Sequence, residues 1–284
     1  MAGAAKLITR FAPSPTGPLH LGHAYSALTA WDSALAVGGA FLLRIEDNDT
    51  QRCRPAYEQA VYDDLAWLGL RWPSPVMRLS DRKTIYDQAI AALLARGLAY
   101  PCSCTRRDIQ TALSAPQEGV SAPHLYPGTC RHRTGQTPTV EDAIRLNMAA
   151  ALEQLSSQPL QWRETGPDHA GLYTLAPDIL ARNHGDIILM RRDIRTAAYH
   201  LSVVIDDAAQ NITHVIRGQD LIDATAIHRL LQALLDLPTP IYHHHRLIRD
   251  AQGKRLAKRD DAKAISTYRA AGMTPQQMRH HLGL

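Results

Sequence analysis

The sequence predicts an α/β protein built around a parallel sheet. Leu7–Phe11 is a short run of strand-forming residues, and Ala40–Ile45 is an apolar run of strand length. Between them, Leu21–Val37 carries apolar residues at helical spacing, and the pair Gly38–Gly39 that follows is typical of a helix end. A strand, a helix and a second strand in this order form the unit from which parallel sheets are built.

The same criteria predict further elements along the chain. The predicted helices are Tyr57–Leu68, Thr84–Arg96, Ala197–Ala208 and Thr225–Leu235. The predicted strands are Ile212–Ile216, Ile241–Tyr242 and Arg246–Ile248, the last before a turn at Asp250–Gly253. Near the end, Ser266 is expected to cap a short helix closed by Gly272, and Thr274–Pro275 to begin another.

The composition is that of a globular protein, with 45% hydrophobic and 20% charged residues among 284. These values exclude a disordered chain, a collagen and a coiled coil. No apolar run reaches the roughly 20 residues that span a bilayer, and the first ten residues do not resemble a signal peptide. We therefore expect a cytoplasmic protein with no membrane partner. The net charge is +4, and the basic excess lies beyond Pro240, which predicts either a solvated face or a polyanion contact.

The segment Pro13–His23 stands between a predicted strand and a predicted helix. A helix start offers unpaired N–H groups and the positive end of the helix dipole, which together suit a phosphate. Gly22, between His20 and His23, would let the backbone approach a base or a phosphate closely. The structural alternative is a pair of surface histidines at a helix start.

The segment Gly253–Arg259 is a glycine turn followed by alternating cations. Cations after a turn can stabilise the charge that develops on a leaving pyrophosphate. Taken alone, the segment favours a solvated basic loop. Neither a Walker pattern nor Gly-x-Gly-x-x-Gly occurs in the sequence, so a nucleotide would be bound in another way.

Together, these two segments resemble the two signatures of class I aminoacyl-tRNA synthetases, which have a Rossmann-type catalytic domain. Several other segments are similar to the glutamyl-tRNA synthetase family, and the matches run from residue 7 to about residue 282. These segments are Arg10–Gly17, Leu43–Asp47, Tyr199–Leu201, Val203–Asp207 and Val215–Gly218.

The resemblance implies a site for glutamate, whose carboxylates suit arginine and whose ammonium suits a buried carboxylate. It assigns Glu46 to the α-ammonium, and the other polar groups to Arg10, Ser14, Tyr199 and Arg217. The structural alternatives are a Glu46–Arg44 salt bridge and an Arg217–Asp220 pair.

For ATP, the resemblance implies binding by His20, Gly22, His23 and Lys258, with His20, His23 and Lys258 also catalytic and Mg²⁺ on the phosphates. The second signature departs from the family's usual Lys-Met-Ser-Lys-Ser, because Arg255 replaces its first lysine and Ala257 its serine. Lys258 retains the second lysine and is the expected ATP contact.

The chain ends soon after the second signature, so we expect it to lack the anticodon-binding domain of a full glutamyl-tRNA synthetase. In this it resembles the glutamyl-queuosine tRNA(Asp) synthetases. That family activates L-glutamate with ATP without tRNA and transfers it to queuosine in the anticodon stem-loop of tRNA(Asp). The alternatives are a truncated glutamyl-tRNA synthetase charging the 3′ end of tRNA(Glu), and a non-catalytic paralogue that binds nucleotide or RNA. We expect a monomer.

Three cysteines, Cys102, Cys104 and Cys130, lie in a short stretch, which in a cytosolic protein favours metal over disulfides. Zinc needs a fourth ligand. The resemblance implies Tyr126 and a structural zinc, although His124 and His132 are chemically better ligands. Three free thiols are the structural alternative, and Cys53 stands apart as a free thiol.

The expected architecture is a Rossmann-type catalytic domain with an inserted zinc-bearing subdomain and a short helical C-terminal part. The first half of the catalytic domain is expected over residues 1–100 and the zinc-binding insertion over 101–139. An acceptor-type insertion and the second half of the catalytic domain follow over 140–240, and the basic loop with its helices over 241–284.

Overall fold

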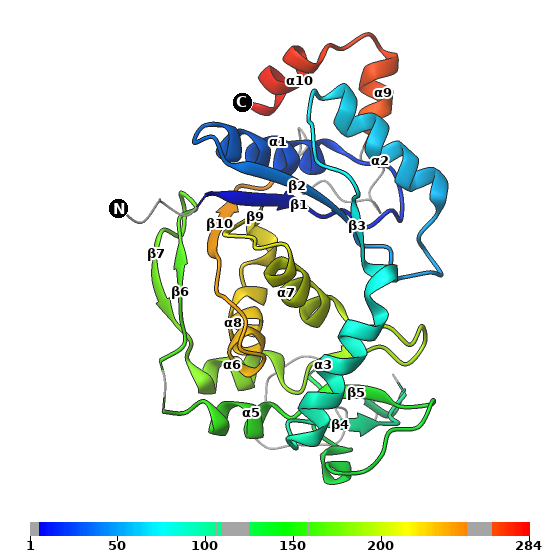
Figure 1. The fold of residues 1–284 in the computed structure, drawn as a ribbon, viewed down its shortest axis with the longest axis vertical. Coiled ribbons are helices and arrows are strands. Elements are labelled where there is room, and N and C mark those ends of the chain that lie inside the picture. The colour runs from blue at the N-terminus through cyan, green and yellow to red at the C-terminus, as the bar shows by residue number, and fades with distance from the viewer. Residues whose placement is uncertain (1–5, 106, 110–124, 158, 249–262) are drawn as a thin grey trace.

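The computed structural model of the chain describes residues 6–105, 107–109, 125–157, 159–248 and 263–284, and these form an α/β fold (Figure 1). The first sheet is parallel, and helix α1 (Leu21–Leu35) connects its first two strands, as predicted. The strands, in sheet order, are β1 (Ile8–Phe11), β2 (Ala40–Ile45) and β3 (Met77–Arg78).

Glycines end α1 as the sequence predicts. Gly38 has a φ of 63°, a conformation that costs little without a side chain. A Cβ on Gly39 would lie 2.3 Å from the carbonyl oxygen of Leu7, so only glycine lets the chain pass this close to the start of β1.

The second sheet joins distant parts of the chain. Its order is β7-β6-β10-β9, and the central β10 is parallel to both of its neighbours. The amide of Thr213 donates to the carbonyl of Ile8 over 3.0 Å, so β9 lies beside β1 and the two sheets adjoin (Figure 1). The strands are β6 (Gln161–Glu164), β7 (Gly171–Thr174), β9 (His214–Gly218) and β10 (Ile241–His245).

The third sheet is antiparallel and lies at the opposite end of the molecule from α10 (Figure 1). Its strands are β4 (Ala99–Cys102), β5 (Ala143–Leu146) and β8 (Ile188–Met190). Cys102 is the last residue of β4, so the insertion expected over residues 101–139 begins within the last two residues of a strand.

Two large groups of buried apolar residues hold these layers together. One lies under α1, β1 and β2 and includes Ile265 and Met278 from the C-terminal helices. The other packs helices of the middle of the chain against the third sheet. The remaining helices are α2 (Pro55–Trp67), α3 (Lys83–Ala95), α5 (Met148–Gln154), α6 (Pro177–His184), α7 (Tyr199–Ala209), α8 (Ala224–Leu234), α9 (Ile265–Ala270) and α10 (Pro275–Leu282).

Two local predictions are wrong. Arg246–Ile248 is not a strand, because β10 ends at His245, opposite Gly218, where its partner β9 also ends. Ser266 does not cap α9: the N-cap is Ala264, and the helix start is set by Ile265, which is fully buried and donates its amide to the carbonyl of Leu19. The Thr274–Pro275 start of α10 is confirmed, with a capping box formed by Thr274.

Among the helices in the described part of the chain, none is long and apolar enough to cross a membrane.

Candidate active site and cysteine cluster

A cavity of about 540 Å³ opens at the carboxyl ends of β1, β2 and β9, beside the first turn of α7. This is the edge of a parallel sheet at which ligands usually bind, because connecting loops diverge there. The cavity brings together all five residues predicted for glutamate, and His23 as well. The lining includes Arg10, Ser14, His23, Glu46, Tyr199 and Arg217.

A buried network of charges includes Arg10 and Glu46, which line this cavity, and Arg44 and Asp207, which do not. Asp207, on α7, accepts from Nε of Arg10 at 3.1 Å and from Nη1 of Arg44 at 2.7 Å through the same Oδ1 atom. Nη2 of Arg44 lies 3.4 Å from Oε1 of Glu46, so the contact expected as the structural alternative for Glu46 is present. Arg10 also donates from Nη1 to the carbonyl of Ile216, which leaves its Nη2 for a ligand.

The pKa values of the two carboxylates in this network are shifted in opposite directions. Burial raises the pKa of Glu46 above its usual range, and the nearby charges of Arg44 and Arg10 only partly oppose this. Burial also acts to raise the pKa of Asp207, but Arg10 and Arg44 outweigh it, and the pKa of Asp207 is lowered. Asp207 is thus a permanent anion between two arginines, whereas Glu46 gains from a cation placed beside it.

Arg217, on β9, is held on several sides by protein groups. Its Nε atom donates to Nε2 of His244 at 2.9 Å, and its Nη1 atom lies 3.1 Å from Nδ1 of His228. Its Nη2 atom donates to the carbonyl of Leu221 and to the hydroxyl of Thr225. These contacts occupy four of its five N–H groups. One Nη1–H is therefore available to a carboxylate, and the bidentate grip expected of an arginine fits Arg10 better than Arg217.

His20 and His23 shape the start of α1. The Nδ1 atom of His20 accepts from the amide of Gly22 at 3.1 Å, and Nδ1 of His23 accepts from the amide of His20 at 3.1 Å. When neutral, each ring therefore carries its proton on Nε2. His23 lines the cavity, whereas His20 caps the helix, and a Cβ on Gly22 would lie 3.0 Å from Cε1 of His20.

The predicted ATP contact Lys258, with Arg255 and Ala257, lies outside the described residues. The described chain resumes at Lys263, and the next residue, Ala264, pairs with His20 in an isolated antiparallel bridge. A residue shortly after the second predicted signature therefore contacts the first signature.

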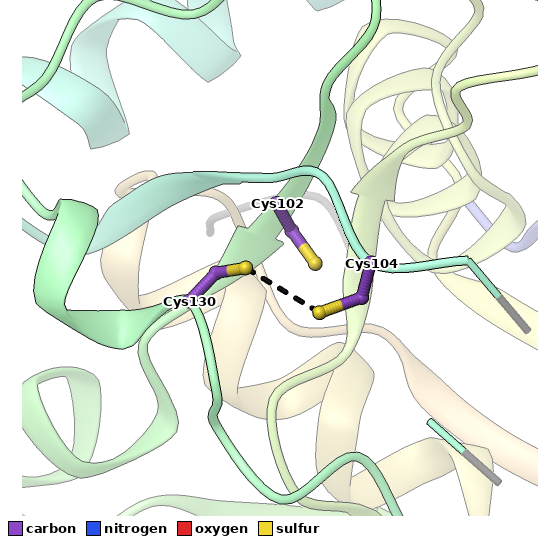
Figure 2. Close-up of side chains that lie close together, drawn as sticks. All are labelled: Cys102, Cys104 and Cys130. Carbon is purple, nitrogen blue, oxygen red and sulfur yellow. Dashed lines mark hydrogen bonds between the residues drawn. The ribbon is translucent and has the colours of Figure 1, made fainter. Parts of the chain in front are cut away.

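The Sγ atoms of Cys102, Cys104 and Cys130 all lie within 4.8 Å of one another, and Figure 2 shows them pointing toward one another. The hydroxyl of Tyr126 lies 3.3 Å from Sγ of Cys102 and 3.6 Å from Sγ of Cys104, and accepts from the amide of Cys130 at 2.8 Å. These four donors converge, as a four-coordinate metal requires.

The surroundings of the cluster separate the candidate fourth ligands. His132 is exposed and its Nδ1 atom lies 2.9 Å from the carbonyl of Thr129, while His124 lies outside the described residues. Burial acts to raise the pKa of Cys130, but hydrogen bonds from Tyr126 and Cys104 outweigh it and lower that pKa to about 6. Cys53 stands apart, next to the carbonyl of Glu46.

A second cavity, of about 710 Å³, lies between the cysteine cluster and the first cavity. It shares Arg191 and Tyr199 with the first cavity. The rest of its wall is largely aliphatic and basic, and includes Cys104, Ile187, Ile188, Arg145 and Arg192.

Several groups that build the site were not predicted from the sequence. Asp207 stands inside a segment that carries the family resemblance, but the resemblance implies no role for it. His228, His244 and Glu164 stand in no motif, and each has another polar residue beside it in the sequence, so no local signal singles them out.

The chain is similar in sequence and in fold to known proteins. A family model described as the catalytic domain of class I tRNA synthetases (E and Q) matches residues 6–284. The glutamyl-Q tRNA(Asp) synthetase of Rhodobacter capsulatus is 53% identical over 98% of this chain and all of that protein. The protein of the same name from Nocardia farcinica is 41% identical over 95% of this chain and 81% of its own length.

Among solved structures, a glutamate tRNA ligase from Elizabethkingia meningosepticum, in complex with its amino acid, has a TM-score of 0.69 and 31% identity. The match covers 90% of this chain but 52% of the ligase, so the chain spans about half the length of that structure.

Proposed function

The chain belongs to the family of class I tRNA synthetases (E and Q), and we propose that it is a ligase that activates L-glutamate with ATP and transfers it to queuosine in tRNA(Asp). The observation that carries this proposal is the 53% identity, over its full length, to a glutamyl-Q tRNA(Asp) synthetase. The charged cavity adds chemical support, because it matches the charges of glutamate group by group.

Two cations, Arg10 and Arg217, and one anion, Glu46, line the cavity. The other charged residues that line it, Asp49, Arg52 and Arg191, pair with one another. Glutamate at neutral pH carries two carboxylates and one ammonium, and is therefore complementary. We assign the ammonium to Glu46, whose ionised form it would stabilise, and one carboxylate to the Nη2 side of Arg10. Arg217 offers its remaining N–H to the other carboxylate, and Ser14 and Tyr199 complete the pocket.

Activation needs no protein nucleophile. A carboxylate oxygen of glutamate bonds to the α-phosphorus of ATP while the bond to the pyrophosphate oxygen breaks, which gives glutamyl-adenylate and pyrophosphate. The N-terminus of α1 and the Nε2–H groups of His20 and His23 supply positive potential for the phosphates. Lys258 and Mg²⁺ are assigned to the same phosphates by the family resemblance.

The acceptor approaches, we infer, through the second cavity, because that cavity shares Tyr199 and Arg191 with the glutamate pocket. Its aliphatic wall suits a flat unpaired base, and Arg192 suits the phosphates on either side of it. A hydroxyl of the queuosine diol then attacks the glutamyl carbonyl, loses its proton and displaces AMP.

The cysteine cluster fits a structural zinc held by Cys102, Cys104, Cys130 and Tyr126. Zinc there would join the end of β4 to the segment that carries Tyr126 and Cys130, and so stabilise the wall of the second cavity. It would supply no step of the reaction.

Two measurements test the proposed activity. Labelled pyrophosphate should exchange into ATP with glutamate and Mg²⁺ present and no RNA added. An RNA hairpin copying the anticodon arm of tRNA(Asp) should accept glutamate with queuosine at the wobble position, and not with guanosine, which lacks the diol. Arg217→Ala should lose the exchange, whereas the exposed Arg182→Ala should keep it.

The alternatives give different results. Charging of the 3′ end of tRNA(Glu), with the queuosine hairpin inert, would identify a truncated glutamyl-tRNA synthetase. A folded protein with neither exchange nor transfer would be the non-catalytic paralogue.

A further inference from the structure

A chain of buried polar side chains runs from Glu164, outside the cavity, to Arg217 in its wall. Oε2 of Glu164 bonds to Nδ1 of His244, and Nε2 of His244 accepts from Nε of Arg217 at 2.9 Å. All three residues are at most 4% exposed. We propose that Glu164 and His244 are positioning residues that hold the guanidinium of Arg217 in place for glutamate, an inference that rests on the proposed function.

The hydrogen bonds admit one arrangement of protons. An arginine only donates and an ionised carboxylate only accepts. The ring of His244 between them must therefore carry its proton on Nδ1 and present a bare Nε2 to Arg217. Glutamine in place of Glu164 would remove this requirement, because an amide can donate or accept, and the ring could then turn an N–H toward the N–H of Arg217.

Hydrogen bonds to its carboxylate keep Glu164 ionised at this position. Its Oε1 atom accepts from three amides, those of Thr165 at 3.0 Å, Gly166 at 2.6 Å and His244 at 2.9 Å. Burial acts to raise the pKa of Glu164, but the hydrogen bonds from His244 and Gly166 outweigh it and lower that pKa to about 2. A Cβ on Gly166 would lie 2.2 Å from the carbonyl oxygen of His244, so the turn after β6 needs glycine to bring these amides to the carboxylate.

A second set of hydrogen bonds reaches Arg217 from α8, through His228. The Nη1 atom of Arg217 lies 3.1 Å from Nδ1 of His228, and Nε2 of His228 lies 3.1 Å from Nδ1 of His200. Since Arg217 donates, His228 carries its proton on Nε2 and donates it to His200. Burial, followed by the charge of Arg217, lowers the pKa of His228 well below its usual range and keeps this ring neutral.

The hydrogen bonds through His244 and through His228 explain how a single N–H of Arg217 can bind glutamate. The guanidinium contributes its charge, while its other donors are fixed by the protein, so its orientation is set before the ligand arrives. The balancing negative charge sits on Glu164, one ring away, and does not compete with the substrate carboxylate for Arg217.

The experiment measures KM for glutamate and for ATP, and separately determines which ring nitrogen of His244 carries the proton. Glu164→Gln, nearly the same in volume, should raise KM for glutamate in pyrophosphate exchange by about tenfold and leave KM for ATP nearly unchanged. In protein labelled with ¹⁵N-histidine, His244 should show a protonated Nδ1 at neutral pH, and should lose this preference in Glu164→Gln. His244→Gln, which keeps a donor and an acceptor, should retain more glutamate affinity than His244→Leu.

A wild-type His244 protonated on Nε2 would overturn the proposal, and this measurement needs no variant to fold. A folded Glu164→Gln with unchanged KM for glutamate, or with both KM values raised equally, would overturn it too. If Arg217→Ala leaves KM for glutamate unchanged, the assignment of Arg217 to glutamate fails instead, and the proton position of His244 still tests the arrangement of the three side chains.

Discussion

The Nε atom of Arg10 donates a hydrogen bond to Oδ1 of Asp207 across 3.1 Å, although 197 residues separate the two. Arg10 lies on β1, the first strand of the chain, whereas Asp207 lies on α7. The proposed glutamate pocket therefore depends on a contact between β1 and α7, two elements that are far apart in the sequence.

Asp207→Asn removes the anion shared by Arg10 and Arg44. Two buried cations then lose the carboxylate that they share, and the free energy of unfolding should fall by about 3 kcal/mol at neutral pH. Because the folded pKa of Asp207 is lowered, its stabilisation is present above the unfolded pKa and is lost as the pH falls through the folded pKa. The difference in free energy of unfolding between wild type and variant, measured with urea, should therefore become smaller in acid.

The control is Asp236→Asn, an exposed position where asparagine tolerates the φ of 54°. It should unfold like wild type. Equal stability of Asp207→Asn and wild type at neutral pH would contradict a structural role for the anion.

Glu46→Gln should stabilise the protein and disable it. Since burial raises the pKa of Glu46 in the folded state, ionisation at neutral pH opposes folding, and this penalty disappears below the unfolded pKa. The melting temperature of the variant should exceed that of wild type at neutral pH and match it in acid. Glutamate-dependent exchange should fall by about 100-fold, because a charge-assisted bond to the ammonium is lost.

In wild type, KM for glutamate should rise as the pH falls, because protonated Glu46 no longer attracts an ammonium. A flat pH profile, or an active Glu46→Gln, would exclude Glu46 as the ammonium partner.

The zinc proposal predicts one zinc per chain in protein purified without chelator. Cys130→Ser should lose zinc, and Tyr126→Phe should weaken binding by at least about tenfold, as loss of a ligand or of its supporting contacts does. Cys53→Ser and His132→Ala are the matched controls and should keep the metal. Zinc retained in Tyr126→Phe and lost in His132→Ala would move the fourth ligand to His132.

The sequence predicts features formed by residues close together in the chain better than features formed by residues far apart. The unit from β1 to β2 is predicted within a few residues, because a strand, a helix and a glycine stop are all local signals. The segment that contains α5, β6, β7 and α6 was missed. Helices of seven and eight residues are too short to show a period, and every residue of β7 is exposed.

The supporting side chains were beyond prediction for a different reason. Glu164 and His244 meet across 80 residues, and nothing near either residue marks it as a partner of the other. The family resemblance implies which residues contact the substrate. It is silent on the buried groups that hold those residues, which only the packing of β6 against β10 reveals.

Arg192→Ala should separate the two half-reactions. Arg192 lines the second cavity and not the first, is 40% exposed, and donates from Nη1 to the carbonyl of Ser103. Glutamate-dependent exchange should be unchanged, because no group of the glutamate pocket is altered. The affinity for the queuosine hairpin in the transfer reaction should fall by about tenfold. The slope of log affinity against log salt concentration should become shallower by about one unit, as expected for the loss of one phosphate contact. Arg71→Ala, an exposed change that touches neither cavity, should affect neither reaction. If Arg192→Ala transfers glutamate as well as wild type at every salt concentration, the acceptor does not pass through the second cavity, and its path must be sought on another side of Tyr199.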